Sequence, residues 1–174
     1  MRSSENGPPT VVESDDIMEG IADSEFSLFD LMAPYVYWPR FKYEGRKTFR
    51  GGPTHLFWMY PPEEDAFLKS RISGVRLYIS DQFNVLTQTE IFDSQSEKLK
   101  TIYISGVKKV DGQAIFSGMD VRNELTRDKT RLRIIDASMG LELPGSLFKA
   151  QSLLDDLQNQ KIPSVRLEDF QSVE

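Results

Sequence analysis

The stretch ISGVRLYISDQFNVLTQTEIFDSQSEKLKTIYISGVKKVDGQAIFSGMDVRNELTRDKTRLRIIDA, residues 72–137, decides the fold class. Short polar segments divide it, and they carry the Asp, Ser and Gly residues that favour turns. Strands of this composition, about 8–12 residues apart, are typical of an antiparallel meander. The sequence therefore predicts a mainly β protein organised around an antiparallel sheet. The apolar runs expected to form its strands are residues 75–79, 85–92, 101–107, 114–121 and 130–135.

A short helix is expected ahead of the sheet, over residues 28–33. Ser24 or Ser27 can act as its N-cap, because a hydroxyl oxygen accepts from the free backbone amides of a first helical turn. Asp30 follows Ser27 by three residues and completes an approximate capping box. Pro34 ends the helix.

Two further strands are expected between this helix and the main stretch. They cover residues 41–49 and 54–60, and the Gly-Gly pair within residues 50–53 predicts the turn between them. The second of these strands is apolar on both faces, so it is either covered on both sides or faces a cavity. Residues 66–72 then connect it to the meander.

The two ends of the chain differ in character from its middle. Residues 1–22 are polar, with an early segment rich in Ser, Pro and Gly, and they predict a flexible leader. Residues 23–154 predict the β domain, and residues 155–174 a tail. A weakly amphipathic helix is expected over residues 147–157, because Leu residues recur there at nearly helical spacing.

Composition limits the classes of function. The chain has 174 residues, a net charge of −6, 39% hydrophobic residues and no Cys. This length suits one domain, and the negative charge with scattered Lys and Arg argues against nucleic-acid binding. The lack of Cys excludes disulfides and thiolate metal sites. No signal peptide is visible at the start of the chain, and no apolar run approaches the roughly 20 residues of a membrane span.

Reactive groups are sparse, and the sequence predicts no enzyme and no cofactor. His55 is the only histidine, and its place in an apolar strand favours a packed, hydrogen-bonded side chain over a general base. No Gly-x-Ser-x-Gly motif and no phosphate-binding loop occurs. The acidic residues 63–65 are interpreted as a solvated turn rather than a cation site.

Aromatic residues are concentrated between residues 35 and 60. They are interpreted either as an ordinary core under a small sheet or as the wall of a cavity for an apolar ligand. Such a cavity would bind through the hydrophobic effect and would need no catalytic group. The group consists of Tyr35, Tyr37, Trp38, Phe41, Tyr43, Phe57, Trp58 and Tyr60.

The order of these features resembles the outer-membrane lipoprotein-sorting protein family, the LolA-like periplasmic carriers. The similarity covers roughly residues 23–154 and rests on an ordered series of short segments rather than on one motif. These segments are ADSEFSLFDL (22–31), YWP (37–39), GGPTHL (51–56), YPP (60–62), VRLYIS (75–80), IFD (91–93), VDGQ (110–113), MDVRN (119–123), TRLRIID (130–136) and LPGSLF (143–148).

The resemblance implies a fold, a ligand and a location. The fold is a curved antiparallel sheet, an unclosed half-barrel, with helices across its concave side. The ligand is an acyl chain of a lipoprotein or a related apolar molecule, and the location is the periplasm or cell envelope. Envelope proteins are the implied partners.

The chain also departs from the family pattern. Members normally begin with a signal peptide, an N-terminal helix and several more strands, and residues 1–22 are too few and too polar to supply them. The N-terminal portion is therefore expected to be lacking. A sheet without its first strands exposes an edge, which favours self-association.

Strand alternation selects the residues expected to line the groove. Side chains alternate between the two faces of a strand, so aliphatic positions share the face opposite the Arg residues of the same strands. The Arg-bearing faces are expected on the wet, convex side and the aliphatic sets on the concave side. The predicted ligand-binding residues are Val75, Leu77, Ile79, Ile102, Ile104, Leu132 and Ile134, with Trp58 and Met119 as additions.

Two functions remain open from the sequence. The first is a non-enzymatic carrier that binds acyl chains in the concave face of the sheet. The alternative is a protein-interaction or envelope-sensor module on the same fold, without cargo transport.

Overall fold

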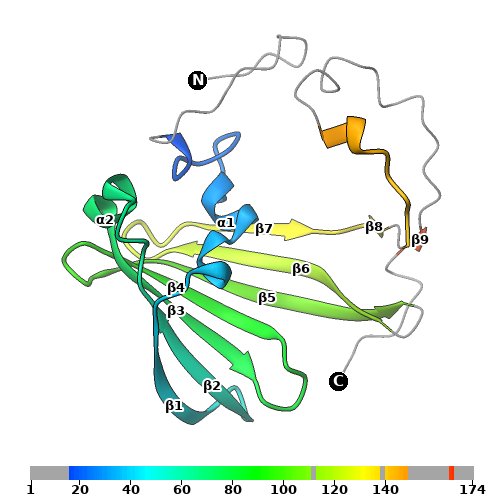
Figure 1. Ribbon diagram of the computed structural model, residues 1–174. Coiled ribbons are helices and arrows are strands. Elements are labelled where there is room, and N and C mark those ends of the chain that lie inside the picture. Colours follow the sequence, from blue (N-terminus) through cyan, green and yellow to red (C-terminus); the bar gives the residue numbers. More distant parts are fainter. Residues whose placement is uncertain (1–15, 111–112, 138–139, 149–164, 167–174) are drawn as a thin grey trace.

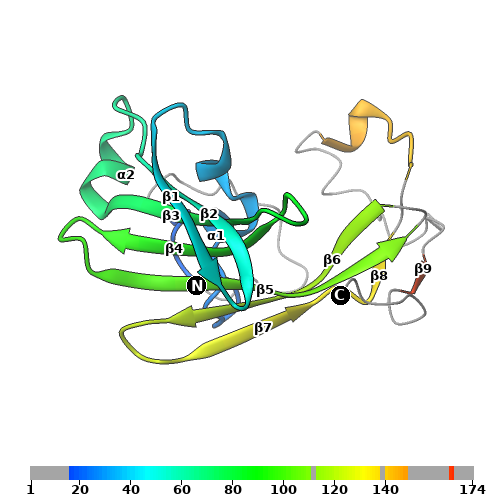
Figure 2. The same cartoon turned by 90° about the horizontal axis from the view of Figure 1, so that it is seen from below.

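The computed structural model describes residues 16–110, 113–137, 140–148 and 165–166, and it is built on one seven-stranded antiparallel sheet. The strands follow one another across the sheet in chain order, so neighbours in sequence are neighbours in space (Figure 1, Figure 2). The first and last strands are separate edges, and the sheet is an unclosed half-barrel, as predicted. The strands are β1 (Phe41–Phe49), β2 (Gly52–Met59), β3 (Ile72–Ser80), β4 (Leu86–Asp93), β5 (Lys98–Val110), β6 (Gln113–Asn123) and β7 (Lys129–Arg133).

The first hairpin turns within two residues. Arg50 and Gly51 connect β1 to β2, and both have positive φ angles, of 50° and 83°. A two-residue loop with positive φ at both positions matches the right-handed twist of the strands that it joins. The turn predicted within residues 50–53 is confirmed.

The helix α1 (Leu28–Met32) carries the capping box that the sequence predicts. Ser27 donates its backbone N–H to Asp30 Oδ2 at 2.8 Å, and the Asp30 N–H donates to Ser27 Oγ at 3.3 Å. Ala33 ends the helix in the left-handed region, with φ 45°. The 3₁₀ helix η2 (Pro34–Tyr37) follows directly.

A second helix, α2 (Ala66–Arg71), lies within residues 66–72, which were expected only to connect two strands. Its N-cap is Asp65, whose Oδ1 accepts from the Leu68 N–H at 2.9 Å. Leu68 is buried and joins the core. In the sequence, Asp65 shortly after two prolines could have indicated the start of this helix. The helix is too short, however, to show a clear apolar period.

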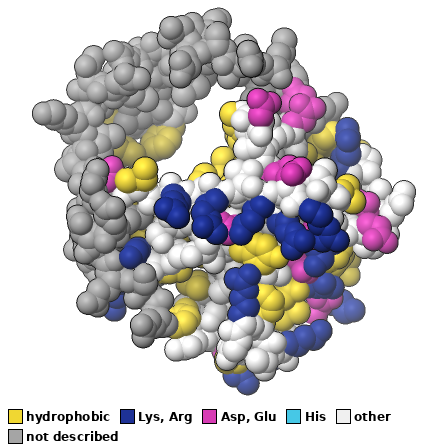
Figure 3. Space-filling model, turned by 180° about the vertical axis from the view of Figure 1, so that it is seen from behind, with side chains coloured by type: hydrophobic (Ala, Val, Ile, Leu, Met, Phe, Trp, Pro, Cys, Tyr) yellow, Lys and Arg dark blue, Asp and Glu magenta, His cyan; other side chains and the backbone are white. Residues whose placement is uncertain are grey.

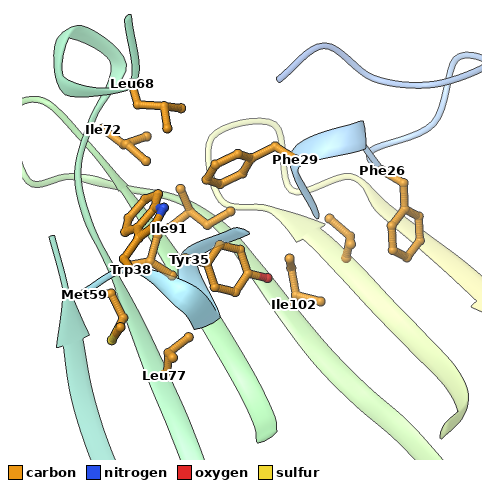
Figure 4. Close-up of a cluster of buried hydrophobic side chains, with 12 residues drawn as sticks. Phe26, Phe29, Tyr35, Trp38, Met59, Leu68, Ile72, Leu77, Ile91 and Ile102 are labelled. Atoms are coloured by element: carbon orange, nitrogen blue, oxygen red, sulfur yellow. The ribbon is translucent and has the colours of Figure 1, made fainter. Parts of the chain in front are cut away.

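The hydrophobic core lies between one face of the sheet and the segment of α1 and η2 (Figure 4). Phe29, Tyr35 and Trp38 come from that segment and contact one another through tilted or edge-on rings. The strands contribute the opposite half of the same cluster. Its buried members from β2 to β6 are Met59, Ile72, Val75, Leu77, Ile91, Ile102 and Val121.

The chain ends contribute little described structure. Ile17 and Met18, within the predicted leader, pack against the core, whereas residues 1–15 lie outside the described residues. The predicted helix over residues 147–157 lies mostly outside them, and η3 (Gly145–Phe148) covers its first part. In the predicted tail, β9 (Val165–Arg166) pairs with β8 (Asp136–Ala137). No helix in the described part of the chain is long and apolar enough to cross a membrane.

Candidate ligand-binding site

Strand register divides the sheet into two chemically different faces. Residues directly opposite each other on paired strands share a face. One row of such partners crosses all seven strands beneath α1 and η2, and we call this side the helix-covered face. The row is Tyr43, Phe57, Leu77, Thr89, Ile102, Val121 and Thr130.

The opposite side, which we call the charged face, carries ionised and polar residues in the next row. Glu90 is buried there and accepts from Lys98 at 2.6 Å, from Tyr78 at 3.0 Å and from Arg76 at 3.3 Å. Burial of Tyr78, with the Glu90 charge beside it, raises the pKa of its phenol to about 12. The row that crosses all seven strands here is Lys42, Trp58, Arg76, Glu90, Thr101, Arg122 and Lys129.

An apolar cavity of about 200 Å³ lies on the helix-covered face, between the α1–η2 segment and strands β4 to β6. Its wall is made mainly of aliphatic and aromatic residues. Burial raises the pKa of Tyr35 above its ordinary value, so this phenol stays neutral in the wall. The lining residues are Asp30, Leu31, Ala33, Tyr35, Leu86, Gln88, Thr89, Ile102, Ile104, Phe116 and Met119.

Asp30 is the only carboxylate among the described residues of this wall. Its Oδ2 accepts from Lys100 Nζ at 2.7 Å and from Ser27 Oγ at 2.8 Å. Its Oδ1 is buried and has no hydrogen-bond partner among the described residues. Gln88 also has an unpaired buried oxygen, but its side-chain amide donates to Glu90 on the charged face. Both residues line the apolar cavity, so Asp30 Oδ1 and Gln88 Oε1 are the two unpaired buried acceptors among the described residues of its wall.

The sequence-predicted site residues divide into three groups. Ile102, Ile104 and Met119 line the apolar cavity. Val75 and Leu77 lie on the same face but are fully packed in the core. Ile79, opposite Leu86, and Leu132, opposite Met119, also lie on this face, outside the cavity lining.

Two predicted residues lie elsewhere. Trp58 is on the charged face, opposite Arg76, whose guanidinium lies 5.2 Å from the Trp58 ring centroid. Ile134 follows the end of β7 and lines a different cavity, next to Arg133. Trp58 was added to the predicted set without a face, because β2 is apolar on both faces and its sequence does not show which side a residue takes; the strand pairing places it outside the helix-covered face.

Several residues of the cavity wall cannot be selected by strand alternation in the sequence. Leu31, Ala33 and Tyr35 enter the wall because the α1–η2 segment lies across the strands. Phe116 joins Ile104 there because β5 is irregular around Gly106, which changes the pairing register with β6. For Tyr35, the concentration of aromatic residues between residues 35 and 60 was the feature of the sequence that indicated a place in a cavity wall.

His55 lies between two polar partners near the first edge of the sheet. Its Nδ1 is 2.8 Å from the Tyr43 hydroxyl, and its Nε2 is 3.2 Å from Asp81 Oδ1. The expectation of a hydrogen-bonded histidine is confirmed, although the His55 side chain is 32% exposed. The described residues contain no group of three His, Asp or Glu side chains that could hold a metal ion.

Asp120 on the charged face should make stability sensitive to acid. Its hydrogen bonds with Arg131, at 2.7 and 2.9 Å, lower its pKa from 3.8 to about 2, against the opposing effect of burial. The contribution to stability of a carboxylate with a lowered pKa is present above the unfolded pKa and is lost as the pH falls through the folded one. We therefore expect Asp120→Asn to lower stability at neutral pH, and the difference to shrink between pH 3.8 and about pH 2.

Denaturant unfolding of both proteins at each pH measures this effect. Asp128→Asn, in the exposed turn before β7, provides the matched control. A deficit of Asp120→Asn that stays constant across this pH range would contradict the assignment.

The fold and the cavity together define an unclosed antiparallel half-barrel with an apolar site under its helical segment. A protein-family model described as "-like: Uncharacterized protein" matches residues 9–155, and the chain belongs to that family. A comparison with curated proteins gives no significant match.

Several solved structures, one of them a LolA superfamily protein, are similar to this chain in fold. A domain described as an outer membrane lipoprotein-sorting protein from Vibrio parahaemolyticus has 19% identity and a TM-score of 0.68, over 81% of this chain and 59% of that one. A DUF1329 family protein from Desulfovibrio piger has 15% identity and a TM-score of 0.61, over 82% and 58%. A LolA superfamily protein from Nitrosomonas europaea has 10% identity and a TM-score of 0.56, over 77% and 59%. The predicted LolA-like fold is confirmed, and the chain spans about three fifths of the length of these structures.

Proposed function

We propose that this protein is a non-enzymatic carrier of the cell envelope that holds an acyl chain of a lipoprotein, or another apolar ligand, on the helix-covered face. The observation that carries the proposal is the apolar cavity between the α1–η2 segment and strands β4 to β6. An acyl chain would bind there by losing contact with water, at about 25 cal/mol per Å² of apolar area buried. No reactive side chain is needed for this task.

The size of the cavity restricts how the ligand binds. Sites for drug-sized ligands measure roughly 300–1,000 Å³, so a cavity of about 200 Å³ accepts only part of a long chain. Leu31 and Phe116 line the cavity and are 44% and 38% exposed, so they extend its apolar surface outward. The remainder of the chain would lie over these side chains, above a wall that contains the unpaired, buried Asp30 Oδ1.

The comparisons support the class of function at a coarse level. The description of the similar domain from Vibrio parahaemolyticus names lipoprotein sorting, and a further similar structure belongs to the LolA superfamily. A carrier of this type works in the periplasm with donor and acceptor proteins of the envelope, and we propose the same setting here.

Blocking the cavity tests the proposal. Ile104→Trp places a large ring in the cavity wall, and we expect it to weaken binding of the fluorescent fatty acid dansylundecanoate roughly tenfold or more. Ile79→Trp is the matched control, because Ile79 is also a partly buried isoleucine of the helix-covered face but does not line the cavity. Fluorescence titration measures binding, and thermal unfolding shows whether the two changes have similar effects on stability.

A triacylated peptide and free palmitate, competed against the probe, distinguish a lipoprotein cargo from a simpler lipid. If neither displaces the probe and wild type takes up no acylated ligand, the carrier proposal is wrong. Stable capture of an envelope protein under the same conditions, without lipid uptake, would favour the interaction-module alternative.

A further inference from the structure

Two cavities adjoin each other on the charged face, on the side of the sheet opposite the apolar cavity. They measure about 450 and 420 Å³ and share Ser105. Strands β5 to β7 form most of their walls. Because Asp120 and Met119 are consecutive residues of β6, one faces this pair of cavities and the other the apolar cavity. We call the two adjoining cavities the basic groove.

The β1–β2 turn bounds one end of the basic groove. Arg50, in that turn, places its guanidinium 4.7 Å from the ring centroid of Tyr103 on β5, although β3 and β4 lie between these strands in the sheet. Both residues line the second cavity. The groove is therefore shaped by two parts of the fold that are distant along the chain.

The charge of the groove is opposite to the charge of the chain. Among its described lining residues one carboxylate, Asp120, faces seven cationic side chains, whereas the whole chain has a net charge of −6. Figure 3 shows a row of Lys and Arg side chains across one side of the molecule. The cationic lining residues are Arg50, Lys108, Arg122, Arg127, Lys129, Arg131 and Arg133.

Carboxylates neutralise only part of this charge. Lys129 and Arg131 share Asp120, at 2.7 Å each. Arg122 and Arg127 share Glu124, at 3.8 and 3.2 Å. For Arg50 and Arg133 the described residues provide no salt-bridge partner, and these two lie in different halves of the groove.

Two serine hydroxyl groups and a glycine complete the wall of the first cavity. Ser105 and Ser117 line it and supply donors beside the cations. Gly118 also lines this cavity, and a Cβ atom there would approach Ser105 Oγ to 2.6 Å. A glycine at this position keeps the space open, since any other residue would have to displace that hydroxyl.

We propose that the basic groove binds a ligand with clustered phosphates, either the headgroup of an anionic lipid or a soluble polyphosphate. The planar guanidinium of Arg donates two parallel hydrogen bonds to a phosphate, and serine hydroxyls donate further ones. Both cavities have volumes typical of ligand sites. The sheet separates the groove from the apolar cavity, so the proposal is independent of acyl-chain binding.

Binding measurements with two probes test the proposal. Inositol hexakisphosphate is titrated by calorimetry, and vesicles of equal parts phosphatidylglycerol and phosphatidylcholine are co-sedimented with the protein, with pure phosphatidylcholine vesicles as the reference. We expect Arg50→Gln and Arg133→Gln each to weaken binding about fivefold, as expected for loss of one cation near anionic phosphates. Each change should also reduce the dependence of binding on salt concentration.

Arg71→Gln is the matched control, because Arg71 is exposed on α2, lies over the Phe67 ring, has no salt-bridge partner among the described residues and undergoes the same change of charge. Circular dichroism confirms that all three variants fold. Binding to the anionic vesicles alone assigns the site to lipid headgroups, and binding to the soluble probe assigns it to clustered phosphates in general. No binding to either probe, or equal weakening by Arg71→Gln, would overturn the proposal.

Discussion

Lys100→Met is expected to lower the free energy of unfolding by about 3–5 kcal/mol, the usual cost of removing one partner from a buried ion pair. Lys100 Nζ donates to Asp30 Oδ2 at 2.7 Å and to the Glu25 carbonyl at 2.8 Å. The Asp30 side chain is only 1% exposed, so without Lys100 its charge would remain buried and poorly compensated. This contact joins β5 to the helical segment, and its loss should also loosen α1.

Lys98→Met on the same strand is the control. Lys98 pairs with buried Glu90 at 2.6 Å, but Glu90 keeps Arg76 and Tyr78 as partners when Lys98 is removed. We therefore expect a clearly smaller loss, measured by urea unfolding. Adding Asp30→Asn to Lys100→Met should recover part of the stability, because the amide carries no charge. Equal losses for the two lysine changes would contradict this account.

Phe29→Ala is expected to cost about 3–5 kcal/mol, as is usual when a fully buried aromatic ring is removed. Phe29 is 1% exposed, and its ring centroid lies 5.6 Å from that of Tyr35 and 6.2 Å from that of Trp38. Removing it leaves a cavity in the cluster that attaches α1 and η2 to the sheet (Figure 4). Because these elements form one wall of the apolar cavity, uptake of the acyl probe should also decrease.

Met32→Ala is the control within the same helix, since Met32 is 61% exposed. Surface changes of this kind usually remain within about 0.5 kcal/mol. Comparable losses of stability for Phe29→Ala and Met32→Ala would show that α1 is not attached through the buried ring.

The sheet could be predicted because its signals are local. Each strand of the meander carries its own β-forming residues, and short turns leave antiparallel pairing with the preceding strand as the simplest arrangement. The capping box of α1 is equally local, since Ser27 and Asp30 are three residues apart. The six-residue helix α2 was missed because it has too few residues to express an apolar period.

The candidate site could be predicted only in part. Alternation predicted that Ile102 and Ile104 share one face of β5, and in the structure both line the apolar cavity on the helix-covered face. It could not assign a face to Trp58, because both faces of β2 are apolar, and the pairing with Arg76 places this residue on the charged face. It also could not select, among residues of the correct face, those that line a cavity, so Val75 and Leu77 proved to be packed core.

Composition, alternation and turn residues were sufficient to specify an antiparallel meander with one apolar face, because those signals act between residues close in the chain. The positions of the two candidate sites depended on contacts between distant segments. The α1–η2 segment closes the apolar cavity through Tyr35, and the β1–β2 turn places Arg50 over Tyr103 in the basic groove. Packing and strand register set these distances, and neither can be obtained from one segment alone.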